Sequence, residues 1–213
     1  MKNLHPRGDG LVTLDVAREL LSPYTDPIRT PFFHAMQGWL EFSDAFPELR
    51  APLSNTTRAN FINDLTIQFA RNQFEYHPEV RQTDEPGFLC LSFKERLLVR
   101  FKKFDDKGFP GNVRTIQQEK IAFQEQLDLP GIPPAATWVI AGYTLNAGGT
   151  DIRTIQVVCF YADHPVWSIP LYDADSDTPG LFDTDIPPRP EPTEQPQRTA
   201  KVRAKNLRTT EGK

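Results

Sequence analysis

The chain has 213 residues, of which 38% are hydrophobic and 24% charged, and its formal net charge at pH 7 is −4. This length fits one large domain or two small ones, and a mildly acidic chain is not built as a whole around nucleic acid. No apolar run approaches the ~20 residues that cross a bilayer, and the N-terminal segment lacks the apolar stretch of a signal peptide, so we expect a cytoplasmic protein without a membrane segment.

The first third of the chain carries the apolar spacing of three helices. The first is predicted over 14–21 and the third over about 57–74, each with apolar residues recurring every three or four positions. The second is predicted over 32–46, after Thr30-Pro31. Proline at the first helical position gives up only an N–H that would be unpaired anyway, so this pair predicts a helix start.

The middle of the chain changes to the alternation of strands. Residues 88–93 and 97–104 are apolar runs separated by three polar residues, which predicts a β-hairpin. A loop follows over 105–111, rich in glycine and charge.

A fourth helix is predicted over 113–127. Thr115 and Gln118 match the spacing of a capping box at its start. Its apolar face is expected to consist of Ile116, Phe123 and Leu127.

Three strands are predicted in the last part of the domain, over 137–145, 152–161 and 166–171. Short turns join them, which predicts an antiparallel meander. The expected fold is therefore α+β: N-terminal helices packed on a mainly antiparallel sheet of about five strands, forming a single domain over residues 1–172.

The sheet is expected to be covered on both faces. Residues 137–145 and 152–161 carry apolar side chains at both odd and even positions, as strands buried on two sides do. The four predicted helices suffice to cover one face of the sheet. The other face then needs a further covering, which we interpret as a hint of a partner chain. The sequence leaves the oligomeric state open.

Residues 173–213 differ sharply in composition. Five aspartates lie within 173–185, prolines follow, and six basic residues lie within 198–213. So few apolar residues cannot offset the entropy of ordering the segment, which predicts a disordered arm. Its cations permit three interpretations: binding of nucleic-acid phosphates, a solubilising terminus, or an arm that folds onto an acidic protein. The candidate binding residues are Arg198, Lys201, Arg203, Lys205 and Arg208.

A second set of cations lies on the predicted strand 97–104. Arg100 and Lys102 are two residues apart and share one face, whereas Lys103 belongs to the opposite face. Such cations bind phosphates or acidic side chains. The alternative is a strand kept soluble by lysine, as sheet edges often are.

The evidence for catalysis is weak. Asp105, Asp106 and Glu119, near Lys107, are the residue types that a magnesium-dependent nuclease uses. The two aspartates, however, lie in a glycine-bearing loop that is typical of an ordinary turn. No histidine or cysteine pair has the spacing of a metal site, so we expect no metal and no cofactor.

The two cysteines, Cys90 and Cys159, lie in apolar strand-like runs. We expect both to be reduced core residues.

The stretches Arg100–Asp105, Leu129–Pro134 and Gly142–Asn146 resemble small uncharacterised bacterial and prophage proteins. Those proteins are encoded beside Xre-type helix-turn-helix regulators fused to ImmA/IrrE-like metallopeptidases. That arrangement is similar to a two-gene toxin–antitoxin or phage-defence module. The resemblance covers about 90–170, carries no catalytic residue to transfer, and implies a protein partner that is also a DNA-binding regulator.

The leading hypothesis is therefore a non-enzymatic protein-interaction component of such a module. One alternative is a nucleic-acid-binding protein that uses the basic hairpin and tail. The other is a metal-dependent nuclease-like toxin.

Overall fold

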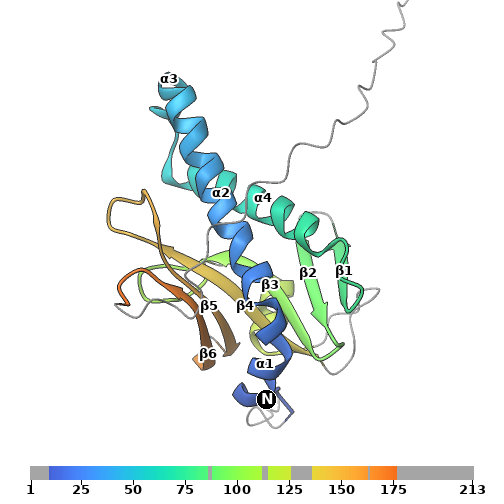
Figure 1. Cartoon of the computed structure of the whole chain (residues 1–213). Coiled ribbons are helices and arrows are strands. Elements are labelled where there is room, and N and C mark those ends of the chain that lie inside the picture. Colours follow the sequence, from blue (N-terminus) through green and yellow to red (C-terminus); the bar gives the residue numbers. More distant parts are fainter. Residues whose placement is uncertain (1–9, 86–87, 112–114, 126–135, 163, 177–213) are drawn as a thin grey trace, which may run out of the picture.

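The computed structural model describes residues 10–85, 88–111, 115–125, 136–162 and 164–176 (Figure 1). Its α-helices are α1 (Leu14–Leu21), α2 (Thr25–Ala45), α3 (Pro47–Arg50), α4 (Asn55–Phe74) and α5 (Ile116–Ala122). Its strands are β1 (Val80–Glu85), β2 (Phe88–Phe93), β3 (Leu97–Lys103), β4 (Thr137–Leu145), β5 (Ile152–Tyr161) and β6 (His164–Asp173). The α+β prediction is confirmed.

The strands form one sheet in the order β1-β2-β3-β4-β5-β6. All neighbours are antiparallel except β3 and β4, which are parallel. The predicted hairpin corresponds to β2 and β3, and the predicted meander to β4, β5 and a β6 that is longer than expected. The prediction of about five strands missed β1, whose sequence Val-Arg-Gln-Thr-Asp-Glu has no apolar alternation. It is a strand because it pairs along its length with β2.

The predicted start of the second helix at Thr30-Pro31 is wrong. The helix α2 begins at Thr25, so Pro31 lies inside it. An internal proline costs about 3 kcal/mol because a helical hydrogen bond is lost. Apolar burial offsets this cost: Ile28 and Phe32, on either side of the proline, are at most 1% exposed.

The predicted apolar face of the fourth helix is also wrong. Within the described residues α5 is short, and Ile116 and Phe123 are 78% and 46% exposed, whereas Ile121 is buried. Gln124 has a φ of 56°, in the left-handed region, and ends the helix there. Leu127 lies outside the described residues. One half of the predicted capping box is confirmed, because the Thr115 hydroxyl accepts a hydrogen bond from the Gln118 N–H at 3.2 Å. The side-chain oxygen of Gln118 accepts from Arg100.

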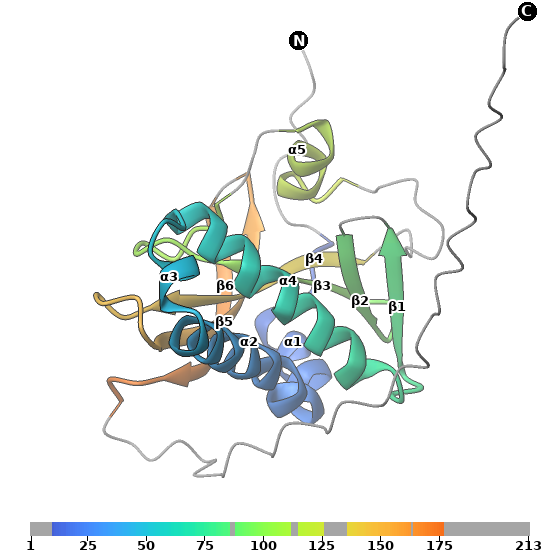
Figure 2. The same cartoon turned by 90° about the horizontal axis from the view of Figure 1, so that it is seen from above.

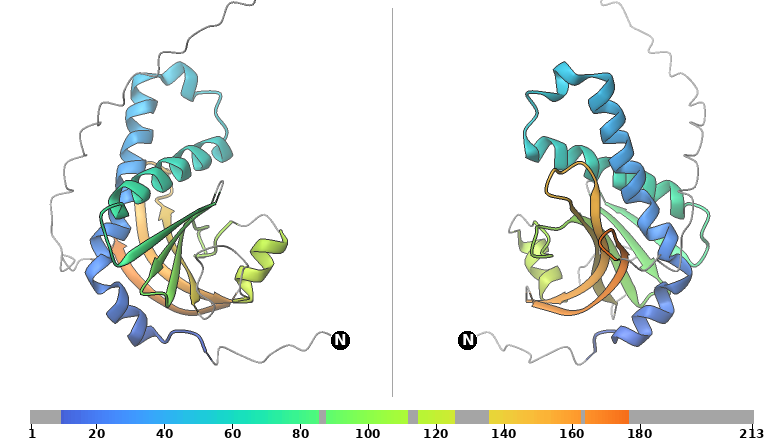
Figure 3. Two further views of the ribbon diagram at one scale, coloured as in Figure 1. Left: turned by 90° about the vertical axis from the view of Figure 1, so that its right-hand side faces the viewer. Right: turned by 60° about the vertical axis from the view of Figure 1, so that its left-hand side comes forward.

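Helices cover both faces of the curved sheet (Figure 2 and Figure 3). The convex face carries α1, α2 and α4 and the main core, in which Phe32 contacts Phe101 and Tyr143. The concave face carries α5, contrary to the expectation that four helices share one side. Two small apolar clusters lie there, and they consist of Cys90, Leu98, Ile121 and Trp138 in one and Phe104, Ile140, Val158 and Phe160 in the other.

Both cysteines are free and buried, as predicted. Among the residues that the structure describes, no helix combines the length and apolarity that a bilayer span requires.

Candidate functional site

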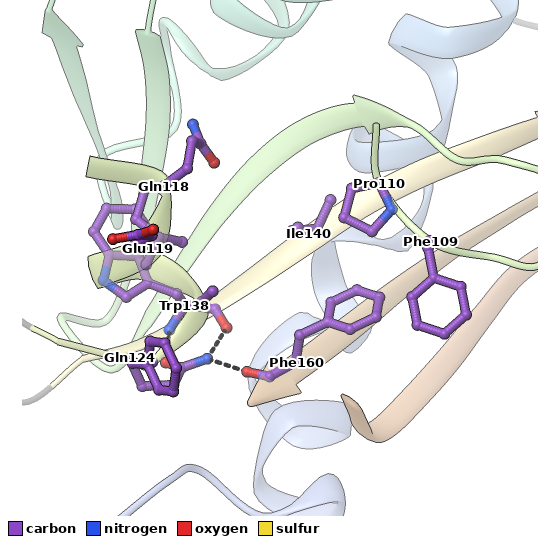
Figure 4. Close-up of a pocket in the computed structure, with 11 residues that line it drawn as sticks. Phe109, Pro110, Gln118, Glu119, Gln124, Trp138, Ile140 and Phe160 are labelled. Atoms are coloured by element: carbon purple, nitrogen blue, oxygen red, sulfur yellow. Dashed lines mark hydrogen bonds between the residues drawn. The ribbon is translucent and has the colours of Figure 1, made fainter. Parts of the chain in front are cut away.

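A pocket of about 420 Å³ opens on the concave face of the sheet (Figure 4). It lies between α5 on one side and the 105–110 loop on the other, with β4 and β5 beneath. Binding pockets for small ligands typically have volumes of about 300–1,000 Å³. The pocket is therefore large enough for one or two bulky side chains or a compact ligand.

The floor of the pocket is apolar. Trp138 and Ile140 are two residues apart on β4, so both project to the concave face, and Phe160 joins them from β5. The Phe104 ring packs over the neighbouring Gly142, where an added Cβ would lie 2.4 Å from the ring. Glycine at this position therefore lets Phe104 lie flat against the sheet beside the pocket.

The wall beside β5 is the 105–110 loop. The Asp105 carboxylate accepts hydrogen bonds from the backbone N–H groups of Lys107 at 2.9 Å and Phe109 at 2.8 Å. These bonds close the loop and place the Phe109 ring 6.0 Å from that of Phe160. Asp105, a candidate catalytic residue, thus shapes the loop.

The opposite wall is α5, and Gln124 fixes its end to the sheet. The Gln124 amide nitrogen donates to the carbonyls of Trp138 at 2.9 Å and Phe160 at 2.7 Å, and the amide oxygen accepts from the Trp138 N–H at 2.8 Å. The Ala162 N–H also donates to the Ala122 carbonyl at 2.8 Å. No sequence pattern predicts a special role for Gln124, because it is a polar residue in a stretch that is predicted to be an ordinary helix.

The three candidate catalytic acids occupy different places. Asp105 and Asp106 lie in the loop, whereas Glu119 is an exposed residue of α5 that lines the pocket. Within the described ranges, no three or more His, Cys, Asp or Glu side chains gather closely enough to hold a metal ion.

Arg100 lies on β3 beside Ile140 of β4, next to the pocket. It is 7% exposed, and its Nη1 donates a hydrogen bond to the side-chain oxygen of Gln118, which lines the pocket, at 3.2 Å. Burial lowers the pKa of the Arg100 guanidinium to about 10, against an opposing effect of Cys90. The sequence predicted that Arg100 and Lys102 share one face of the strand, but not that Arg100 is buried under α5.

Lys102 follows on the same face of β3, beside Gly142. Burial lowers the pKa of Lys102, and the charge of Arg100 lowers it further. Among the described residues, the Lys102 ammonium has no hydrogen-bonding or ion-pair partner. Two partly desolvated like charges therefore lie next to each other, and an anionic group placed beside them would be stabilised.

The remaining predicted cations are not part of this arrangement. Lys103 belongs to the opposite face of β3 by strand alternation. The basic residues Arg198, Lys201, Arg203, Lys205 and Arg208 lie outside the described residues.

Comparisons of the chain with protein families, with curated proteins and with solved structures find no match.

Proposed function

We propose that the chain is a non-enzymatic protein-interaction component whose concave face takes up a segment of a partner protein. The observation that carries this proposal is the apolar pocket that opens beside Arg100 and Lys102. A segment with a bulky apolar residue and a nearby carboxylate satisfies both features. Its apolar part leaves water, and its carboxylate compensates the partly desolvated ammonium of Lys102.

The rim of the pocket supports the same proposal. Phe109 and Phe123 are 36% and 46% exposed, and both line the pocket. Partly exposed aromatic residues around an apolar depression are characteristic of protein interfaces, where they supply much of the binding energy.

The burial of Arg100 favours this proposal over binding of nucleic acid through β3. Cations that bind duplex phosphates must reach them from the protein surface, and Arg100, a residue only 7% exposed, is buried. A nucleic-acid-binding function would then rest on the basic residues of the tail.

The narrower proposal concerns the partner. The resemblance of residues 90–170 to proteins encoded beside helix-turn-helix regulators supports a partner of that kind. We extend the proposal accordingly to a component of a bacterial toxin–antitoxin-like or phage-defence module.

The test is co-purification of the full-length chain with its partner from its own host, compared between two double variants. Phe109→Asp with Phe123→Asp places two charges on the pocket rim. Phe46→Asp with Leu49→Asp introduces the same charges at residues 52% and 60% exposed near α3, away from the pocket.

We expect the rim variant to lose a stoichiometric partner and the α3 variant to keep it. A partner that remains with both variants, or a wild-type chain that is always recovered as a lone monomer, contradicts the proposal. Thermal unfolding of both variants checks that each is folded.

A further inference from the structure

A second cavity, of about 300 Å³, opens among the helices of the convex face, away from the concave pocket. It lies between the second half of α2, the connection after α3 and the start of α4, at a tip that projects beyond the sheet (Figure 1). Arg50 and Arg58 line this cavity, and none of its described lining residues is acidic. In a chain whose net charge is −4, two cations without an acid beside them form an unusual local surface.

The turn between β4 and β5 restricts the position of Arg58. The Nη1 atom of Arg58 donates a hydrogen bond to the Gly149 carbonyl at 3.4 Å. Gly149 has a φ of 64°, and a Cβ at this position would lie 2.7 Å from that nitrogen, so only glycine allows the close approach. The guanidinium is therefore partly ordered before a ligand arrives, which reduces the entropy lost on binding.

The charges of both arginines have no acidic partner within the described part of the chain. Arg50 makes no side-chain hydrogen bond or ion pair there. The described interactions of Arg58 are with neutral groups, namely the Gly149 carbonyl and the Tyr143 hydroxyl. Burial raises the pKa of Tyr143 and the charge of Arg58 opposes this effect. Because the two like charges line one cavity, an anion bound there would be stabilised by both.

The start of α4 supplies further hydrogen-bond donors. The Ser54 hydroxyl accepts from the Thr57 N–H at 3.1 Å, and the Ser54 carbonyl accepts from the Arg58 N–H at 3.0 Å. The N–H groups of Asn55 and Thr56 have no acceptor among the described residues, as is usual in the first turn of a helix. These donors would not define a site by themselves, but they add to the two guanidinium groups.

This combination of groups specifies a doubly charged anion with several oxygens. The planar guanidinium group matches the geometry of phosphate, and two of them compensate two charges, whereas a carboxylate carries only one. The volume is at the lower end of the range of about 300–1,000 Å³ for ligand sites, so a phosphate group with a small organic remainder fits. Leu53, which lines the cavity and is 37% exposed, offers apolar surface to that remainder.

We propose that the cavity lined by Arg50 and Arg58 binds a phosphate dianion, either as a small phosphate monoester or as phosphate itself. This site is separate from the concave pocket and requires no partner protein. Both ligands share the same recognition chemistry, and the experiment below distinguishes them.

The test is isothermal titration calorimetry of the full-length chain at low ionic strength, with inorganic phosphate and phenyl phosphate as probes. At about pH 8 the dianion is the main form of both. We expect one binding site per chain. Arg50→Gln with Arg58→Gln should weaken the binding by about tenfold or more, because charge-assisted hydrogen bonds are lost. Thermal unfolding checks that the variant is folded.

The matched control is Lys94→Gln with Arg96→Gln. These residues are exposed cations at the turn between β2 and β3 and, like Arg50, have no described ion pair. We expect this variant to bind both probes with the affinity of the wild type. Phosphate that binds the two double variants equally is held by the general charge of the chain, and this outcome overturns the inference.

A third probe defines the class of phosphate. Dimethyl phosphate carries one negative charge, as the phosphodiesters of nucleic acid do, and we expect it to bind about tenfold more weakly than inorganic phosphate. Equal affinity for the two overturns the assignment to a dianion. The first two probes identify the source: tighter binding of phenyl phosphate supports a monoester, and tighter binding of inorganic phosphate supports phosphate itself. A wild-type chain that binds neither of them overturns the inference outright.

Discussion

Gln124 and Trp138 are joined by two hydrogen bonds, one at 2.8 Å from the Trp138 N–H to the amide oxygen and one at 2.9 Å from the amide nitrogen to the Trp138 carbonyl. The side-chain amide thus pairs with β4 as a peptide group of a neighbouring strand would. It also bonds the Phe160 carbonyl of β5, so a single side chain fixes α5 above the pocket.

The first prediction concerns this amide. Gln124→Ala leaves one N–H and two carbonyls of the sheet without their partner, so we expect a loss of about 1–3 kcal/mol in the free energy of unfolding. Urea unfolding measures this loss. Gln37→Ala is the matched control, because Gln37 donates to Glu41 at 2.9 Å on an exposed helix surface, where we expect a change within about 0.5 kcal/mol. Equal losses for the two variants contradict the assigned role of Gln124.

The second prediction concerns Gly142. Gly142→Ala places a methyl group 2.4 Å from the Phe104 ring and forces the ring off the sheet, so we expect a destabilisation of about 1–3 kcal/mol. Gly111→Ala is the control, since a Cβ there meets no atom within 4 Å. Adding Phe104→Leu should reduce the effect of Gly142→Ala, and a double-mutant cycle by chemical denaturation measures this coupling. Additive effects would show that the ring is not the obstacle.

The third prediction concerns the pH dependence of stability. Burial raises the pKa of both Cys90 and Cys159 to about 12, above the usual value of 9 for a thiol. In the unfolded chain the thiols lose their protons first, so the folded state binds more protons between these values. Stability should therefore fall as pH rises from about 9 towards 12.

Urea unfolding at a series of pH values measures this slope. Cys90→Ala with Cys159→Ala should flatten it, whatever its effect on stability at pH 7. A slope unchanged by the double substitution contradicts the prediction. The folded wild type should also react slowly with thiol reagents, because the thiolate is the reactive form and both side chains are buried.

Local sequence patterns predict part of this fold, and the rest depends on tertiary contacts. The strands β4 and β5 follow from apolar runs bounded by turns, and the shared face of Arg100 and Lys102 follows from strand alternation. The strand β1 has no such pattern, because its structure depends on pairing with β2.

The pocket was not predictable for the same reason. Its walls and floor bring together Phe109, Gln124 and Phe160, which are far apart in the sequence. Gln124 reaches the sheet because its backbone takes a φ of 56°, which sequence periodicity does not encode. The burial of Arg100 likewise depends on which face α5 covers, and α5 lies in the crossover that the parallel pair of β3 and β4 requires.

The last prediction concerns the charge of Lys102. Burial and the neighbouring Arg100 both disfavour its ammonium form, so Lys102→Met should leave stability unchanged or raise it by up to about 1 kcal/mol. The same substitution should weaken retention of the partner, because the cation that compensates its carboxylate is gone. Binding groups commonly show this opposition between stability and function.

Lys103→Met is the matched control, because Lys103 is the next residue on β3 and belongs to the opposite face. We expect it to keep the partner at the wild-type level. Co-purification at increasing salt concentrations measures retention, and thermal unfolding measures stability. If Lys102→Met and Lys103→Met retain the partner equally at every salt concentration, the charge beside the pocket does not recognise an acidic segment. Binding would then depend on the apolar floor alone.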